Sequence, residues 1–392
     1  MSFMLKAIKQ KLNFRYTYWW FRLANFKRKL FRNELTADQK NALEDYERGI
    51  ALYKQTDPAL VKSKRHVSKD LNRLMKYWHC YPDVYFRMGM FLKDYTDWER
   101  MTSFLPQNAF TRYERQWKPY LEYAVLLENK VIFNDLLTYN GIPVPKVLFS
   151  FRNGRFFSKG SELSDSAVDT ILSESSVNRI FAKKAVGNCG KGVSVFSRKG
   201  NGYYASGGEL VTAEFIRSVC RKEDHHFEEQ LSQDHILSQF CPDTINTIRV
   251  VTVNNSRNQC KIVGAAIRFG RLGGYVDNLA QGGVSVSLDI NSGELFDYGM
   301  REYDLTHYYE HPDTKIKFAH VIIPQWPAIK DLIYHVSSLL PPFREIGWDI
   351  ALTPDGPVIV ELNTGTGVYS VQMGPDFGIA KACDKYIHPY SH

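Results

Sequence analysis

The sequence lacks the cysteine spacing that metal and redox sites require. No two of its six cysteines are separated by only two residues. Neither a zinc site nor a thioredoxin-type site is therefore indicated. Dispersed cysteines without a pairing pattern are typical of reduced thiols in a cytosolic protein, so we expect a cytoplasmic protein. The cysteines are Cys80, Cys189, Cys220, Cys241, Cys260 and Cys383.

Long apolar runs are also missing. A membrane-spanning helix needs about 20 consecutive apolar residues, and no part of the sequence approaches that length. Near the N-terminus the longest stretch without charge runs from Tyr16 to Phe21, which is too short even for the core of a signal peptide. With 44% apolar and 23% charged residues in a chain of 392, the composition is that of a globular protein of two or three domains.

Acidic residues are absent from residues 1–33, which instead hold nine Lys or Arg side chains and several Tyr and Trp. The rest of the chain is close to neutral, so this segment carries the net charge of +8. Basic residues are attracted to anionic lipid, and Tyr and Trp prefer the headgroup region. We therefore expect peripheral contact with the inner face of a membrane. A helix packed on the protein body is the alternative; no nucleic-acid-reading motif is present, so we expect no nucleic-acid partner.

Three regions of the chain differ in composition and in the secondary structure that their patterns predict. Residues 1–128 are poor in glycine and predict a series of helices, broken at Pro58, Pro82 and Pro106. Residues 129–242 alternate between strand and helix patterns. Residues 243–392 are dominated by β-branched runs bounded by Gly, Asn and Asp, which predict strands.

A glycine-rich loop follows the strand that is predicted around Lys183. It holds Gly187, Gly190 and Gly192, together with Asn188 and Lys191. Glycines let backbone amides turn toward an anion, and the lysines add positive charge. The spacing matches neither a Walker A loop nor a dinucleotide fingerprint. A plain glycine-rich hairpin is an equally good interpretation of this loop by itself.

Two carboxylates and an amide converge in the segment 347–363. Two short strands joined by Pro354-Asp-Gly-Pro357 predict a hairpin, in which side chains alternate between the two faces. A four-residue loop would place Asp349 opposite Leu362, one position from Glu361, and Glu361 would share a face with Asn363. Close carboxylates need a proton or a cation between them, and Mg²⁺ prefers such oxygen ligands. A solvent-facing polar edge is the alternative.

The order of these parts resembles the ATP-grasp superfamily over roughly residues 125–375. The segment from Asn129-Lys130 to Gly141-Ile-Pro-Val-Pro145 is similar to the family's entry motif. Within the superfamily the closest likeness is to the sugar-transfer-associated group, related to α-L-glutamate ligases. Its segments resemble Pro242-Asp-Thr-Ile-Asn-Thr-Ile-Arg249 and Asn278-Leu-Ala-Gln-Gly-Gly283. The resemblance implies an α+β ATP-grasp fold, in which two subdomains clamp ATP, with a helical N-terminal extension.

The resemblance also implies roles for individual residues. Lys130 and Lys183 would neutralise phosphates, the loop 187–192 would close over them, and Arg249 would stabilise the transferring phosphoryl group. Where the family has Lys-Pro, this chain has Lys183-Lys184, so either lysine is open as the phosphate ligand, and the family alignment favours Lys183. The adenine hinge would comprise Glu228, Glu229, Gln230 and Leu231. The magnesium ligands would be Asp349, Glu361 and Asn363.

The acceptor substrate is the least defined part. Arginine forks match carboxylates, so Arg268 and Arg271, with Asn278, Gly282 and Gly283, are candidates to grip it; solvated strand-end charges are the alternative for the two arginines. The resemblance implies an ATP-dependent carboxylate–amine ligase acting through an acylphosphate. Its small-molecule substrates would be an amino acid and a sugar or lipid-linked glycan of surface polysaccharide synthesis. A kinase acting on a hydroxyl and an inactive nucleotide-binding scaffold remain the other two hypotheses.

Overall fold

The computed structural model describes residues 37–115, 122–187, 192–221, 223–254, 259–275, 277, 279, 282–341, 343–374 and 378–387. The chain divides into two compact units. The smaller comprises residues 1–116, 302–306 and 375–392, and the larger comprises 117–301 and 307–374. Residues 1–33 lie outside the described ranges, so their membrane contact stays a prediction, as do the domain boundaries at 128 and 242. No helix in the described ranges is long and apolar enough to cross a bilayer.

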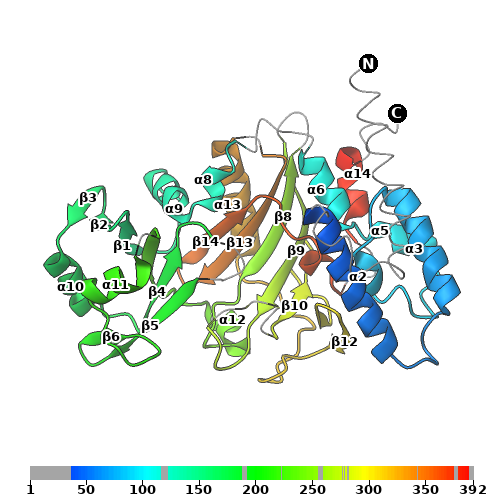
Figure 1. Cartoon of the computed structure of the whole chain (residues 1–392), viewed down its shortest axis with the longest axis horizontal. Helices are drawn as coiled ribbons and strands as arrows, with labels where there is room; N and C mark the ends of the chain where they lie inside the picture. Colours follow the sequence, from blue (N-terminus) through cyan, green and yellow to red (C-terminus); the bar gives the residue numbers. More distant parts are fainter. Residues whose placement is uncertain are drawn as a thin grey trace, which may run out of the picture. The chain divides into compact units, whose positions relative to one another are not determined.

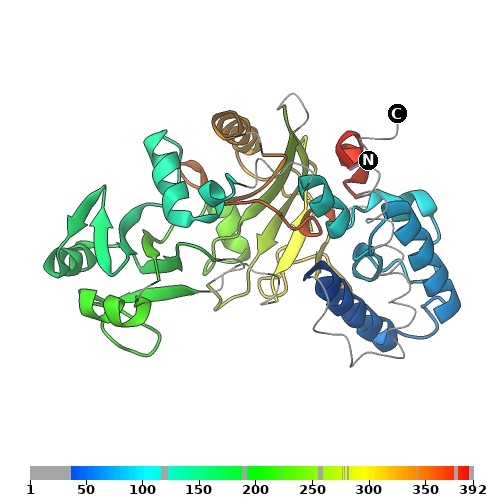
Figure 2. The ribbon, with the colours of Figure 1, turned by 45° about the horizontal axis from the view of Figure 1, so that its top comes forward.

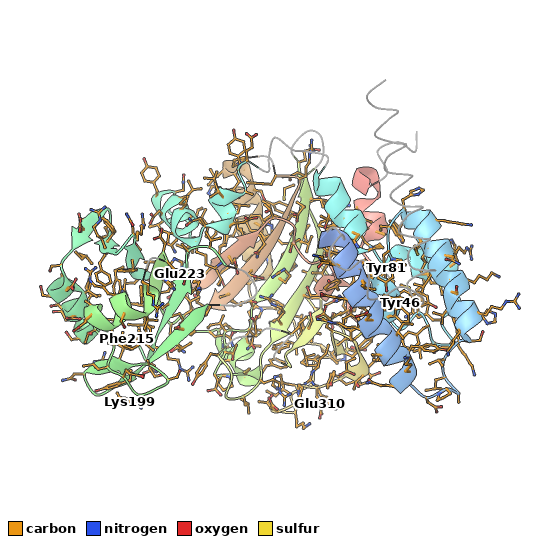
Figure 3. The ribbon with its side chains drawn as sticks, viewed as in Figure 1. Tyr46, Tyr81, Lys199, Phe215, Glu223 and Glu310 are labelled. Carbon is orange, nitrogen blue, oxygen red and sulfur yellow. The ribbon has the colours of Figure 1, made fainter. Side chains whose placement is uncertain are left out.

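The smaller unit is helical, as its sequence predicts (Figure 1). Its helices end or begin close to the three prolines, since proline cannot continue a helix interior. Tyr46 and Tyr81 meet edge to face inside it, with ring centroids 6.4 Å apart (Figure 3). The described helices are α2 (Ala37–Gln55), α3 (Lys64–Trp78), α4 (Val84–Arg87), α5 (Trp98–Ser103), α6 (Gln107–Arg115) and α14 (Ala380–Ile387).

Buried charge connects one later segment of the chain to this helical unit. The guanidinium of Arg87, buried on α4, pairs with Asp45 of α2 and with Glu302. Tyr303 donates to Asp45 as well, and its ring lies under Arg87 at 4.4 Å. These contacts explain why residues 302–306 belong to this unit despite their distance in sequence.

The strands form two seven-stranded antiparallel sheets, and every strand except β12 lies wholly in the larger unit. The first has the strand order β3-β2-β1-β7-β4-β5-β6. Helices α10 (Asp165–Glu174) and α11 (Ala213–Cys220) bury one of its faces in a core rich in phenylalanine. Its strands are β1 (Val147–Arg152), β2 (Arg155–Ser158), β3 (Ser161–Leu163), β4 (Arg179–Lys184), β5 (Val193–Lys199), β6 (Gly202–Tyr204) and β7 (His225–Glu229).

The second sheet has the order β12-β11-β10-β9-β8-β13-β14. Short helices α8 (Val125–Glu128), α9 (Lys130–Tyr139) and α12 (His235–Phe240) contribute to its core, and η3 (Ser370–Gln372) contacts β8, β9 and β10. Its strands are β8 (Ile248–Asn254), β9 (Cys260–Phe269), β10 (Val284–Ser287), β11 (Gly299–Arg301), β12 (Asp304–Tyr308), β13 (Glu345–Thr353) and β14 (Gly356–Asn363).

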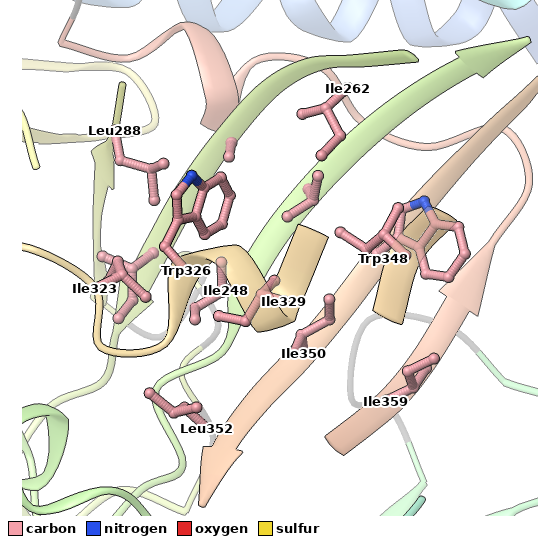
Figure 4. Packing of buried hydrophobic residues seen from close by; sticks show 14 of the residues in the cluster. Ile248, Ile262, Leu288, Ile323, Trp326, Ile329, Trp348, Ile350, Leu352 and Ile359 are labelled. Carbon is pink, nitrogen blue, oxygen red and sulfur yellow. The ribbon is translucent and has the colours of Figure 1, made fainter. Parts of the chain in front are cut away.

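Helix α13 (Trp326–Leu339) covers one face of the second sheet (Figure 2). Its buried face inserts Trp326 and Ile329 among strand residues that include Ile350 (Figure 4). Trp348, fully buried in the same cluster, donates from its indole to Thr252 at 2.9 Å. Because this face of each strand is apolar, alternation leaves the opposite face free for polar side chains.

The hairpin of β13 and β14 differs from the predicted one in turn and register. Thr353 pairs with Gly356, so the turn contains two residues rather than four. Gly356 has a φ of +126°, which glycine adopts without strain. A bulge then leaves Val360 without a partner, and Asp349 pairs directly with Glu361 instead of Leu362. The predicted register was therefore wrong by one residue, but the two carboxylates are even closer than expected.

Candidate active site

A row of polar side chains crosses the second sheet on the face away from α13. Asp349 of β13 pairs with Glu361 of β14 on one side and with Arg249 of β8 on the other. Arg249 pairs with Ala266 of β9, and Arg268 lies two residues further along that strand, on the same face. Arg268 in turn pairs with Ser285 of β10. Antiparallel pairing thus brings side chains from five strands to one surface.

Asp349 is held by two arginines. Arg249 binds it through a fork, with Nε to Oδ1 at 2.6 Å and Nη2 to Oδ2 at 3.0 Å, and Arg268 Nη2 lies 3.1 Å from Oδ1. Burial would raise the pKa of Asp349, but the two guanidinium groups hold it below its ordinary value. Arg249 also donates to Thr366 at 3.0 Å, where Gly347 leaves room that a Cβ would close.

Arg268 is fixed from a second side. It donates from Nε to Thr247 at 3.2 Å, and its Nε lies 3.4 Å from the carboxylate of Asp277. Thr247 in turn donates its backbone N–H to Asp277 at 2.9 Å. Burial disfavours the guanidinium charge, yet Asp277, Asp349 and Glu361 together raise its pKa. The side chain is therefore a permanent, oriented cation under this face of the sheet.

Glu361 meets a lysine from outside the sheet. Lys130 Nζ donates to Glu361 Oε1 and to the carbonyl of Gly187, both at 2.8 Å. Lys130 begins α9, where Asn129 caps the helix by accepting from the amides of Val131 and Ile132. The lysine therefore connects the carboxylate cluster to the first residue of the glycine-rich loop. A pocket lies here, lined by Lys130, Lys183, Lys184, Gly187, Val193, Val360 and Glu361.

The two candidate phosphate lysines have different partners. Lys183 forms an ion pair of 2.5 Å with Glu228 of β7, and His226 reaches the other oxygen of that carboxylate at 2.8 Å. Burial would raise the pKa of Glu228, but Lys183 and His226 hold it at about 2. Lys184 instead pairs at 2.7 Å with Glu223, which is exposed just before the start of β7 (Figure 3). Alternation along β4 places the two lysines on opposite faces, as predicted.

The predicted adenine hinge follows Glu228. The amide of Glu229 donates to the carbonyl of Lys146 at 2.9 Å, and that of Gln230 donates to the carbonyl of Arg179 at 3.0 Å. Both amides therefore serve to attach β7 to its neighbours. Among the described residues, the Leu231 amide donates to no backbone carbonyl, so it is the one of these three amides that does not attach β7 to its neighbours.

The predicted magnesium ligands suit a hard cation in their chemistry. Asp349, Glu361 and Asn363 present oxygen atoms from two adjacent strands on one face. Each carboxylate oxygen has two lone pairs, so the bonds from arginine and lysine leave acceptor capacity. Within the described ranges no group of three or more His, Cys, Asp or Glu side chains could hold a metal. A site here therefore depends on the amide of Asn363 as its third donor.

The predicted acceptor residues are only partly brought together. Arg271 forms a fork with Asp313, with Nε at 2.7 Å and Nη2 at 2.5 Å, and does not join the polar row. Gly282 lies beside it, because a Cβ there would be 3.8 Å from Nη1 of Arg271. Gly283 directly precedes β10, two residues before Ser285. Asn188, Gly190, Lys191 and Asn278 lie outside the described residues.

Sequence reasoning missed Thr247, Asp277 and His226. His226 and Glu228 have the i, i+2 spacing that puts both on one face of a strand, and this signal was available in the sequence. Asp277 directly precedes the Asn278 segment, and its position beside a predicted substrate residue could have singled it out. Thr247 carries no comparable signal.

Comparison with known families identifies this arrangement. A family model described as sugar-transfer associated ATP-grasp matches residues 108–386, which is well over half of the chain. No curated protein matches the sequence.

Several solved structures are similar to this chain over part of its length. A RimK domain protein ATP-grasp from Sphaerobacter thermophilus is 13% identical with a TM-score of 0.35, and the match covers 63% of this chain and 62% of that one. Biotin carboxylase from Campylobacter jejuni is 12% identical with a TM-score of 0.40, covering 68% and 47%. D-alanine–D-alanine ligase from Bacillus anthracis is 11% identical with a TM-score of 0.33, covering 66% and 61%. The match thus spans less than two thirds of each of these relatives.

Proposed function

The chain belongs to the sugar-transfer associated ATP-grasp family, and from this membership we propose that it is an ATP-dependent carboxylate–amine ligase. The observation that carries the proposal is the contact of Lys130 with both Glu361 and the Gly187 carbonyl. This contact brings a cation, a carboxylate cluster and the start of a glycine-rich loop to one pocket. Such a combination suits a nucleoside triphosphate, whose phosphates need positive charge and backbone N–H donors.

In this proposal each of the site residues has its own role in binding ATP or in phosphoryl transfer. Lys130 and Lys183 neutralise the phosphates, and residues 187–192 cover them. The Leu231 amide donates to the adenine ring. Arg249 and Arg268 are fixed cations, so they stabilise charge that moves during phosphoryl transfer without reorganising. Asp349, Glu361 and Asn363 would hold Mg²⁺, which supplies further neutralisation of phosphate charge.

The proposed reaction has two steps. A carboxylate oxygen of the acceptor attacks the γ-phosphorus, the bond to the β,γ-bridging oxygen breaks, and ADP and an acylphosphate result. The amine then attacks the acyl carbon, loses a proton and displaces inorganic phosphate. Holding both partners in line contributes most of the rate, since phosphoryl transfer needs mainly positioning and charge neutralisation. Arg268, with Arg271, Asn278, Gly282 and Gly283, is proposed to orient the acceptor.

We propose an amino acid and a sugar or glycan precursor as the substrates, in surface polysaccharide synthesis. In the same proposal the enzyme works in the cytoplasm, and residues 1–33 bring it to lipid-linked sugars at the membrane. Their composition, basic and aromatic without acid, supports this part. Deleting residues 1–33 should weaken binding to anionic vesicles and leave ATP binding unchanged. Equal pelleting of the full and shortened chains would show that part to be wrong.

A product assay tests the central proposal. With candidate carboxylates and amines, a ligase releases ADP and inorganic phosphate only when both substrates are present. A kinase would leave the phosphate on a hydroxyl acceptor, and an inactive scaffold would bind ATP without turnover. Either result would contradict ligation. Phosphorus NMR separates free phosphate from a phosphorylated acceptor directly.

A further inference from the structure

Helix α3 (Lys64–Trp78) in the smaller unit has one face buried and the opposite face strongly basic. Its buried side chains are apolar and lie along one stripe of the helix: Val67, Leu71, Leu74, Met75 and Trp78. The opposite stripe carries Arg65, Lys69, Arg73 and Lys76, all exposed. At 3.6 residues per turn, spacings of four, four and three place these four side chains in a single row.

No acidic side chain of α3 offsets the positive charge of this row. The single acid of α3 is Asp70, which is half-buried and bonds to Lys62 at 2.9 Å and to the Tyr85 hydroxyl at 3.2 Å. In the part of the chain that the structure describes, no carboxylate forms an ion pair with Arg65, Lys69, Arg73 or Lys76. Like charges at i and i+4 destabilise a helix, so the row works against the stability of α3.

The start of α3 breaks a second rule of helix stability. Lys64, Arg65 and His66 occupy the first turn, and no acid accompanies them. The N-terminal end of a helix carries partial positive charge, which acidic side chains stabilise and basic ones oppose. Ser63 caps the helix, and five buried residues anchor it, so packing compensates for the unfavourable charge. Departures from local stability rules concentrate at functional surfaces.

Aromatic side chains lie at the C-terminal end of this row. The guanidinium of Arg73 stacks on Trp98 at 3.6 Å from the ring centroid, and Tyr77 meets the same indole edge to face at 5.9 Å. Tyr77 is 43% exposed. Basic side chains beside Tyr and Trp are typical of a surface that lies at the headgroup level of a bilayer.

We propose that the outer face of α3 binds an anionic membrane surface. The row is straight and lies opposite the buried stripe, so all four cations can contact one plane when the helix axis lies parallel to it. The row spans about 16 Å at 1.5 Å per residue, which is several lipid headgroups. The nine basic residues of residues 1–33, which include no acid, would add to the same attraction. The proposal does not depend on which reaction the enzyme catalyses.

The test uses the full-length chain and vesicles of phosphatidylcholine with or without phosphatidylserine. The variant Arg65→Gln/Lys69→Gln/Lys76→Gln keeps Arg73 on Trp98 and removes three charges. Each basic side chain near an anionic leaflet raises binding by about fivefold. We expect the variant to bind phosphatidylserine vesicles at least tenfold more weakly, as a rough lower bound, and to lose much of the salt dependence. The single variant Lys69→Gln should weaken binding by about fivefold.

A matched control removes three exposed lysines from the larger unit: Lys159→Gln/Lys199→Gln/Lys317→Gln. It should bind vesicles as the wild type does. ATP turnover without vesicles should be unchanged in both triple variants, so a failure of the proposed reaction would be seen separately. The melting temperature of the α3 variant should hold or rise, because repulsion along the row is relieved.

Three outcomes would overturn the proposal. The α3 variants could bind anionic vesicles as the wild type does, which would make the row a solvated face. The control variant could lose as much binding as the α3 variant, which would show that binding depends on the net charge of the protein and not on the α3 row. The α3 variants could lose affinity for duplex RNA while keeping that for vesicles, which would identify a nucleic-acid surface.

Discussion

The two sheets of the larger unit hold their charged side chains in opposite ways. In the first sheet, Lys183 and Lys184 each make an ion pair with one glutamate. In the second, one carboxylate, Asp349, is gripped by two guanidinium groups. A lysine amine is a point charge on a flexible stem and exchanges partners readily, whereas an arginine fork fixes a carboxylate in orientation. The comparison indicates a fixed platform of paired charges around Asp349 in the second sheet, and lysines in the first sheet whose glutamate partners can be exchanged for a ligand.

The sharpest way to break this comparison is to remove the centre of the platform. Asp349→Asn should lower the free energy of unfolding by about 3–5 kcal/mol, because the partly buried guanidinium of Arg249 loses its ion pair and that of Arg268 keeps only Asp277. Denaturant titration measures the change. Ser285→Ala, on the same face, removes only a neutral hydrogen bond and should cost about 1 kcal/mol. Equal losses in the two variants would show that Asp349 is not the centre of a platform.

Glu361 should separate catalysis from stability. Its side chain is 25% exposed and its ion pair is with the flexible Lys130. Glu361→Gln should therefore change the unfolding free energy by about 1 kcal/mol or less. ATP turnover should fall to background, by roughly 10²–10³-fold, because charge stabilisation in the transition state is lost. Glu223→Gln removes the partner of Lys184 as a control and should leave turnover intact; near-normal turnover in Glu361→Gln would refute the site.

The two lysines of β4 sharpen the comparison within the first sheet. Lys183→Ala should weaken ATP binding by about tenfold or more, the value of one charge-assisted hydrogen bond. Lys184→Ala should have little effect, since its ion pair with Glu223 is exposed to solvent. Nucleotide titration by calorimetry measures both. The reverse result would mean that β4 presents its other face to the nucleotide.

The smallest effect is expected at Arg271 and Asp313, a fork like that of Arg249 and Asp349 but with side chains 38% and 18% exposed. The Arg271 hydrogen bonds hold the pKa of Asp313 at about 2, below its ordinary value. The contribution of the Arg271–Asp313 ion pair to the free energy of unfolding is therefore present at neutral pH and is lost as pH falls through about 2. Solvent screening limits it to about 1 kcal/mol. Unfolding of wild type and Asp313→Asn should differ by this amount at neutral pH and converge in acid; a larger difference would show that burial does not distinguish the two forks.

Much of the architecture could be predicted from the sequence. The α+β ATP-grasp fold and the helical N-terminal region are confirmed, because hydrophobic periodicity and the order of the motifs are visible along the chain. The strand predicted around Lys183 is β4 (Arg179–Lys184), and the hairpin predicted within 347–363 is formed by β13 and β14.

The ion-pair partners of the charged residues could not be predicted from local sequence patterns. Nothing local in the sequence shows that Arg268 contacts Asp277 or that Arg271 turns to Asp313, because these pairs form only when distant segments meet. Lys130 and Glu361 are 231 residues apart and still touch. The hairpin register failed for a different reason. Loop length was inferred from the Pro-Asp-Gly-Pro sequence, whereas the chain turns at Pro354-Asp355 and inserts an extra residue later in β14.

That extra residue, Val360, reverses the parity of β14. Before it, Ile359 points into the core; after it, Leu362 does, although the two are separated by an odd number of positions. An uninterrupted strand would send Glu361 and Asn363 into the apolar layer together with Ile359. The bulge shifts the alternation of side chains along β14 by one residue. As a result, the end of the strand presents the oxygen atoms of Glu361 and Asn363 on the face opposite the core. Straightening this bulge with Val360 retained would invert the chemistry of the strand end, whereas deleting Val360 would leave Glu361 and Asn363 on the polar face.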